Sequence, residues 1–179
     1  MHVKCMPSIK VYNDFMTETE LNDAIKIIDN NHWSYGGISN TEKDDDTKFW
    51  HMNLNEVPHF SETIFKKIKE SVSMEDLELE RVYANGQTCG LDGSYHTDSI
   101  EDGHYTFMLY LSDINHNNVE AIQGHTEFKT NSRIISIEPI KNKGIFFKSD
   151  MLHRGLGPSR RSNILRVTVA YKMYRRSSR

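Results

Sequence analysis

The stretch Tyr105-Thr-Phe-Met-Leu-Tyr-Leu111 is a near-continuous apolar run with the length of one strand. Runs of this kind are typical of buried β-strands. Further short apolar stretches lie on either side of it, separated by Gly, Asn, Asp or Pro, at residues 80–84, 125–128, 134–138, 144–147 and 165–173. Many short strands punctuated by turn residues predict a sandwich or a small barrel.

The chain before residue 77 contains helix signals as well as short strands. Thr17-Glu-Thr-Glu20 matches a capping box, and apolar residues at helical spacing follow it, so we expect a helix to about Asn30. A second helix is expected over Pro58–Val72. Short strands are expected at residues 9–12, 33–35 and 49–54, and a polar loop at 39–48. We therefore predict one domain over residues 1–179, in which residues 1–76 support a β core at 77–174.

Composition narrows the class of protein. The chain is 37% hydrophobic, with eight Phe, eight Tyr and two Trp, which is typical of a globular protein. A formal net charge of −3 argues against nucleic-acid binding across the whole surface. Two cysteines are too few for a disulfide framework or a thiolate zinc site. No apolar run has the length of a membrane span, and residues 1–10 lack the apolar region of a signal peptide, so we expect a soluble monomer in a reducing cytoplasm.

His96 and Asp98 form a His-x-Asp pair just before the apolar run. Residues two apart on a strand point to the same face, so the two side chains could hold one ion. Chance readily produces such a pair in a chain with nine histidines, and a surface histidine beside a turn-capping aspartate is the alternative. His153 follows the apolar stretch 144–147. Two imidazoles and one carboxylate are the ligand set of an Fe(II) site with open coordination positions.

Arg166 lies inside an apolar strand. In Leu165–Tyr171 it shares one strand face with Thr168 and Ala170. A charged residue in such a strand should be paired if it is buried. Its guanidinium could bind a carboxylate through two hydrogen bonds, with help from the Thr168 hydroxyl. An exposed arginine on an edge strand is the alternative.

These features occur together in one order along residues 78–173. The order is Arg81-Val-Tyr83-Ala-Asn-Gly86, His96-Thr-Asp98, Tyr110-Leu-Ser112, Gly124-His-Thr-Glu-Phe128, Pro139-x-x-Asn142-x-Gly-x-x-Phe147, His153 and Arg166-Val-Thr-Val-Ala-Tyr171. It resembles the Fe(II)/2-oxoglutarate-dependent oxygenases, specifically the prolyl-4-hydroxylase-like branch, and the C-terminal part resembles small oxygenases of marine phages and bacteria. Two features depart from the family: Gln123-Gly124 replaces a frequent Gly-Gly, and thirteen residues separate His153 from Arg166. The long gap leaves Arg160 or Arg161 as alternatives to Arg166.

The resemblance implies a double-stranded β-helix (jelly roll) with N-terminal helices packed on it. It also implies Fe(II) bound by His96, Asp98 and His153, with the distal carboxylate of 2-oxoglutarate bound by Arg166. The other cofactor-binding residues that it implies are Tyr110 as a hydrogen-bond donor, Tyr83 as a pocket residue, Met108 and Thr126 as pocket walls, and Thr168. The implied reaction hydroxylates an unactivated C–H bond, with peptidyl proline as the first substrate to consider, and converts 2-oxoglutarate and O2 to succinate and CO2. Ascorbate could support such an activity, and a phage-encoded enzyme would work in the host cytoplasm.

Other functions remain open from sequence. Arg161-Ser-Asn163-Ile-Leu-Arg166 loosely resembles the nucleic-acid demethylases, and arginines at 175, 176 and 179 could form a basic patch, but the spacing is one residue short. The other alternative is a metal-binding module, either a non-enzymatic jelly roll or a cupin-like protein. Neither of these needs a cation such as Arg166 after the last metal ligand, His153. A zinc hydrolase is not favoured, because the sequence has no His-Glu-x-x-His motif. In an oxygenase, residues 33–50, 85–92 and 113–123 would frame the entrance.

Overall fold

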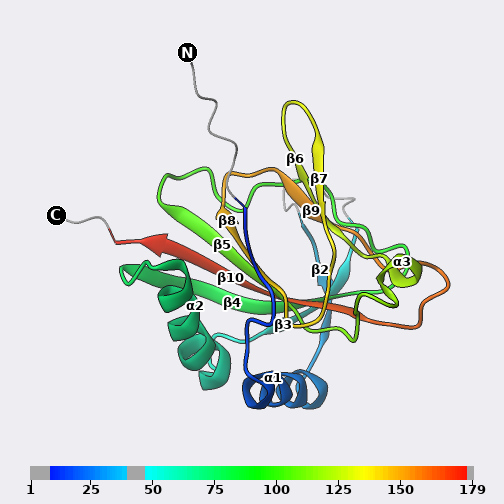
Figure 1. Ribbon diagram of the computed structural model, residues 1–179, viewed down its shortest axis with the longest axis horizontal. Coiled ribbons are helices and arrows are strands. Elements are labelled where there is room, and N and C mark those ends of the chain that lie inside the picture. Colours follow the sequence, from blue (N-terminus) through cyan, green and yellow to red (C-terminus); the bar gives the residue numbers. More distant parts are fainter. Residues whose placement is uncertain (1–8, 40–46, 177–179) are drawn as a thin grey trace.

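Two antiparallel sheets form the core of the computed structural model, which describes residues 9–39 and 47–176 (Figure 1). The larger sheet has the order β1-β8-β5-β10-β4-β3-β2, and the smaller has the order β7-β6-β9. The strands of the larger sheet are β1 (Lys10–Tyr12), β2 (Ser34–Gly37), β3 (Phe49–Asn53), β4 (Leu77–Gln87), β5 (His104–Tyr110), β8 (Gly144–Lys148) and β10 (Arg166–Arg175). Those of the smaller are β6 (Thr126–Lys129), β7 (Ile134–Ile137) and β9 (His153–Gly155). The predicted mainly β jelly roll is confirmed.

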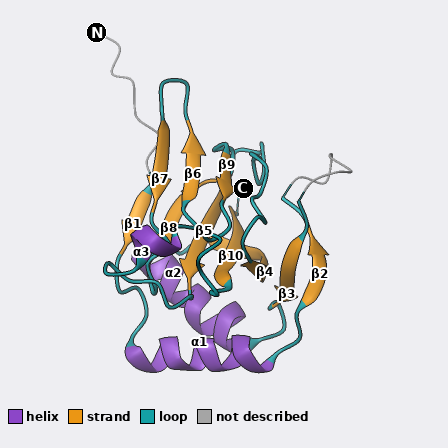
Figure 2. Ribbon diagram, turned by 90° about the vertical axis from the view of Figure 1, so that its right-hand side faces the viewer, coloured by secondary structure: helices purple, strands orange, loops and turns teal. Residues whose placement is uncertain are grey.

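The two N-terminal helical regions lie on one side of the larger sheet, away from the smaller sheet (Figures 1 and 2). The helix α1 (Glu18–Asn30) begins with the expected capping box, in which Thr17 and Glu20 satisfy each other's backbone N–H groups. The second expected helix is divided into a π-helical segment, η1 (His59–Ile64), and α2 (Phe65–Val72). A short helix, α3 (Val119–Ile122), was not predicted. Residues 40–46 of the predicted polar loop lie outside the described residues.

The two faces of β10 contact different parts of the molecule. Val167, Val169, Tyr171 and Met173 belong to the main apolar core, which also contains the buried residues of α1 and α2. The alternate residues of the strand, beginning with Arg166, point to the opposite face. Because β10 lies between β5 and β4, Arg166 is not on an edge strand, and the edge-strand interpretation is wrong.

Two segments differ from the predicted boundaries. The strand β4 continues to Gln87, although the predicted strand ends at residue 84, because β10 pairs with it as far as Arg166 opposite Gln87. His153 begins the short strand β9, which pairs with β6, although no strand was predicted at this position. In both cases hydrogen bonds from a distant partner strand override weak local strand propensity.

Gly144 lies where β8 crosses the ring of Phe107. A Cβ atom at Gly144 would lie 2.3 Å from Phe107 Cζ, so Gly144→Ala should destabilise the protein by about 1–3 kcal/mol through overpacking. Urea unfolding measures this loss. The double variant Gly144→Ala/Phe107→Leu should lose less stability than the two single losses added together, because leucine frees the space that the ring fills. Additive losses would contradict this explanation.

Candidate functional site

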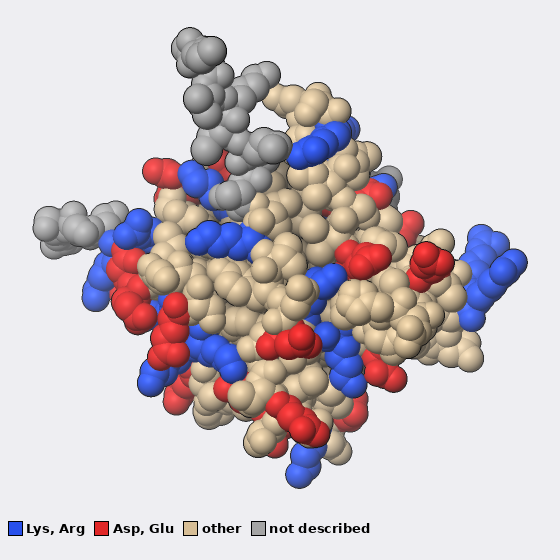
Figure 3. All heavy atoms as spheres, in the orientation of Figure 1, with Lys and Arg blue, Asp and Glu red and all other residues tan. Residues whose placement is uncertain are grey.

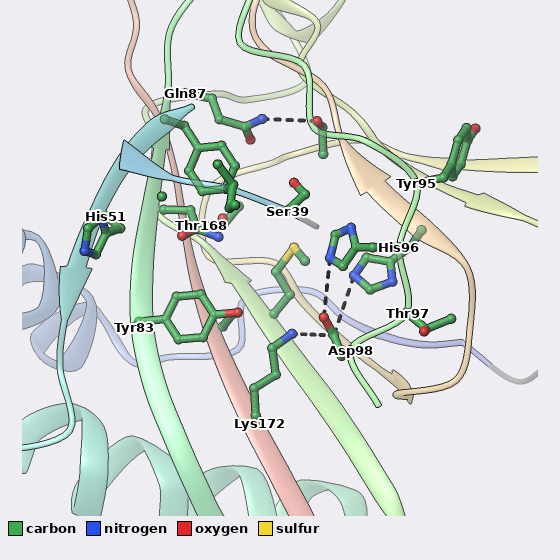
Figure 4. Close-up of a pocket in the computed structure, with 18 of the residues that line it drawn as sticks. Ser39, His51, Tyr83, Gln87, Tyr95, His96, Thr97, Asp98, Thr168 and Lys172 are labelled. Atoms are coloured by element: carbon green, nitrogen blue, oxygen red, sulfur yellow. Dashed lines mark hydrogen bonds and ion pairs between the residues drawn. The ribbon is translucent and has the colours of Figure 1, made fainter. Parts of the chain in front are cut away.

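Two histidines and one aspartate converge between the two sheets. The backbones of His96 and His153 form a two-way bridge, with both N–H···O=C distances at 2.9 Å, and the Asp98 N–H donates to Ser149 O at 2.8 Å. The ligand atoms of the three side chains lie within 4.8 Å of one another. Asp98 Oδ1 is 3.4 Å from His96 Nε2, and Asp98 Oδ2 is 3.6 Å from His153 Nε2. The fold thus brings together the three predicted ligands, although His96 and Asp98 do not share a regular strand (Figure 4).

Both imidazoles are oriented by the backbone. Nδ1 of His96 lies 3.0 Å from Ser94 O, and Nδ1 of His153 lies 2.8 Å from Met151 O. A carbonyl can only accept, so each Nδ1 carries a proton, and Nε2 is the ring nitrogen that faces the other two side chains and could bind a metal. Burial lowers the pKa of His153 to about 4, so its ring is neutral near pH 7. Two imidazoles and one carboxylate fit a divalent transition metal such as Fe(II).

Asp98 is held by two donors on the same oxygen. The Thr106 hydroxyl donates to Oδ2 at 2.6 Å, and the ammonium of Lys172 forms an ion pair with that oxygen. Burial alone would raise the pKa of Asp98, but the nearby Lys172 and His153 outweigh it and hold this pKa well below its ordinary value. Sequence reasoning missed Lys172, although the alternation of Arg166, Thr168 and Ala170 leads directly to it.

Arg166 is fully buried and surrounded by neutral acceptors. Its guanidinium donates to Gly124 O at 2.5 Å, to Gln87 Oε1 at 2.6 Å and to Thr126 Oγ1 at 2.9 Å. Burial lowers the pKa of Arg166, and no carboxylate among the described residues forms an ion pair with it. A buried cation that contacts only neutral dipoles is costly, so this environment favours an anionic ligand. Gln87 was not predicted as a site residue.

The predicted tyrosine and threonine partners lie around Arg166. The Tyr110 ring is 5.6 Å from the guanidinium carbon, and its hydroxyl donates to Thr126 Oγ1 at 2.7 Å. Thr126 is also 3.7 Å from the sulfur of Met108. Tyr110 and Thr126 pack beside the guanidinium without lining the adjacent cavity, whereas Met108, Thr168 and Tyr83 line it.

A cavity of about 690 Å³ joins the His-Asp-His group to Arg166 (Figure 4). The segment 37–39 and the strands β3, β4 and β10 form much of its wall. The expected entrance regions 33–50 and 85–92 therefore contribute to it, but none of residues 113–123 does. Arg160 and Arg161 line a separate hollow beside Gly157, so the cavity contains Arg166 and neither alternative arginine.

Solved structures with the same architecture cover nearly the whole chain. An oxidoreductase of the 2OG-Fe(II) oxygenase family from Burkholderia pseudomallei superposes with a TM-score of 0.72 at 12% identity, over 94% of this chain and 85% of that one. The chain has the fold of the Fe(II)/2-oxoglutarate oxygenases. No protein-family model matches it, and no curated protein sequence does.

Two further oxygenase-fold structures differ in what they bind. A prolyl hydroxylase from Trichoplax adhaerens, in complex with a hypoxia-inducible-factor peptide, gives a TM-score of 0.65 at 14% identity, over 93% of this chain and 83% of that one. HygX from Streptomyces hygroscopicus, with nickel and 2-oxoglutarate bound, gives 0.70 at 10% identity, over 96% and 84%. The oxygenase fold predicted from sequence is confirmed.

One departure from the oxygenase pattern lies beside Arg166. Gln123, where the family often has glycine, adopts a φ of +62°, a region that favours glycine. Gly124 has a φ of +82°, and a Cβ atom there would lie 3.1 Å from Arg166 Cδ. The second glycine of the pair is therefore needed for the close approach of Arg166, and the first is replaced at some cost in backbone strain.

The basic residues at the C-terminus are already paired with acids. Arg175 Nε lies 2.7 Å from Asp76 Oδ2, and Arg176 Nε lies 3.3 Å from Glu78 Oε1. Arg179 lies outside the described residues. On the face shown in Figure 3, basic and acidic side chains are intermixed. Within the described part of the chain, no helix combines the length and the apolar character needed to cross a membrane.

Proposed function

We propose that this protein is an Fe(II)- and 2-oxoglutarate-dependent oxygenase that hydroxylates an unactivated C–H bond. The observation that carries the proposal is the fully buried Arg166, which has no carboxylate partner among the described residues and lines the same cavity as the His-Asp-His group. A metal-binding jelly roll without a keto acid has no need for this cation.

In the proposed enzyme, His96 and His153 bind Fe(II) through Nε2, and Asp98 binds it through a carboxylate oxygen. Bound Fe(II) would supply the oxidising chemistry, in which 2-oxoglutarate and O2 become succinate and CO2 while one oxygen atom enters the substrate. Arg166 binds the distal carboxylate of 2-oxoglutarate, exchanging neutral acceptors for a charged one. Thr126, which accepts from both Arg166 and Tyr110, would keep the guanidinium in place, and the Thr168 hydroxyl would help to bind the same carboxylate. Apolar contacts from Met108 help to exclude water from the reacting region.

For the substrate we propose a protein or peptide, with peptidyl proline first. The Trichoplax prolyl hydroxylase, which is in complex with a peptide, supports this choice, whereas HygX also has a structure with hygromycin B bound. Proline peptides incubated with Fe(II), 2-oxoglutarate, O2 and ascorbate should gain the mass of one oxygen atom. Small molecules are incubated under the same conditions for comparison. If only small molecules gained an oxygen atom and no peptide did, this result would contradict a peptide substrate.

Anaerobic addition of Fe(II) and then 2-oxoglutarate should produce the visible charge-transfer absorption of a keto acid chelating the metal. The expected band requires the His-Asp-His group, so His96→Ala should remove it. This variant is a suitable control because the His96 side chain is only partly buried, at 19% exposure, and its loss leaves the core packing in place. A folded, iron-bound wild-type protein without the band would contradict the proposed use of 2-oxoglutarate.

A further inference from the structure

Two cationic side chains stand opposite each other on neighbouring strands and line the cavity. Lys172 on β10 pairs in register with Arg81 on β4. Both cations lie near the ring of Tyr83, with Lys172 Nζ 5.9 Å and Arg81 Cζ 5.7 Å from its centroid. Lys172 is buried, at 5% exposure, whereas Arg81 is exposed at the cavity wall. Figure 4 shows the Lys172 side chain directed toward Asp98 beside Tyr83.

This arrangement favours the binding of a further anion. Like charges directly opposite each other on antiparallel strands repel, and burial of one of them increases the cost. Within the described part of the chain, Asp98 is the only acidic residue that lines the cavity, and Arg81 forms no ion pair there. Asp98 therefore compensates Lys172 alone and leaves Arg81 uncompensated.

The proposed function leaves this excess of positive charge in place. Fe(II) and Arg166 together carry three positive charges, which Asp98 and the two carboxylates of 2-oxoglutarate balance. Lys172 is then one further positive charge at a buried position, with Arg81 beside it. An ammonium has three N–H donors. Lys172 directs one to Asp98 and a weak one, at 3.5 Å, to the Thr106 hydroxyl. At least one donor therefore has no partner among the described residues and could bind a ligand.

We propose that Lys172 and Arg81 bind a carboxylate of the substrate and so place its reacting C–H bond beside the metal. This inference rests on the proposed function and names the chemical class of its substrate: an acid, not a neutral or cationic molecule. The carboxylate belongs either to a free acid or to an acidic side chain of a peptide. Both sources present the same group to the two cations.

The test uses the full chain loaded anaerobically with Fe(II) and 2-oxoglutarate. Its probes are N-acetylglutamate against its uncharged diamide, N-acetylglutamine amide, and terminally blocked Gly-Glu-Gly against Gly-Gln-Gly, with binding measured by calorimetry. An acid should bind at least about tenfold more tightly than its amide. Preference for N-acetylglutamate indicates a free acid, and preference for the glutamate peptide indicates an acidic side chain. No binding of either acid at millimolar concentration would overturn the proposal.

Three variants test the role of the two cations separately from the proposed oxygenase function. Lys172→Met should remove the preference for the acid, and Arg81→Met, at an exposed position where folding is not at risk, should reduce it severalfold. Lys66→Met, an exposed change on α2 with 80% side-chain exposure, should keep the full preference. Equal preference in wild type and Arg81→Met would overturn the role of the cation pair. Absence of the 2-oxoglutarate band in wild type would instead overturn the proposed function.

Discussion

Replacing Arg166 with methionine should weaken 2-oxoglutarate binding by about 30-fold or more while Fe(II) binding stays nearly unchanged. Truncating one partner of a buried, hydrogen-bonded charge pair costs roughly 2–5 kcal/mol, and each 1.4 kcal/mol is tenfold in affinity. The metal-binding group has no hydrogen bond to Arg166 among those the structure describes, so its affinity for iron should not depend on this cation. Titrating the iron-loaded protein with 2-oxoglutarate and following the charge-transfer band measures the change.

Two further variants make the Arg166 result interpretable. Arg166→Lys keeps the charge but loses the planar guanidinium, so it should recover only part of the affinity. Arg161→Met removes an exposed arginine that lines the separate hollow beside Gly157, and it should bind 2-oxoglutarate as wild type does. An unchanged affinity in Arg166→Met, with a loss in Arg161→Met, would transfer the role to the loop between His153 and β10.

Asp98→Ala should abolish metal binding and also destabilise the metal-free protein by about 3–5 kcal/mol. Removing one partner of a buried ion pair leaves an uncompensated charge, and here that charge is the ammonium of Lys172. From sequence alone, this substitution is expected to leave the fold largely intact. The ion pair with Lys172 changes that expectation, because both side chains are nearly excluded from solvent, at 6% and 5% exposure.

The double variant Asp98→Ala/Lys172→Met separates the two effects. It removes the buried charge together with its partner, so urea unfolding should show most of the lost stability recovered. Binding of Fe(II) should remain absent, because the carboxylate ligand is still missing. Recovery of metal binding in the double variant would contradict the role of Asp98 as a ligand. A single variant as stable as wild type would contradict the strength of its ion pair with Lys172.

Local sequence patterns determined much of the fold. The capping box at Thr17 places the start of α1, because its hydrogen bonds lie within four residues. Apolar runs place most strands within one or two residues of their observed bounds. The candidate ligands His96, Asp98 and His153 were also recognisable, since their order and spacing follow the family pattern. Their roles in binding iron stay a prediction.

Only the tertiary structure decided what surrounds these residues. The acceptors of Arg166 and the partner of Asp98 come from strands far apart in the chain: Gln87 lies 79 residues before Arg166, and Thr106 and Lys172 are 66 residues apart. Sheet register sets these contacts, and register depends on pairing across the whole of β10. The sequence by itself therefore determined which chemical groups are present and which face of each strand they occupy. The antiparallel pairing of β4, β10 and β5 decided which of those groups meet.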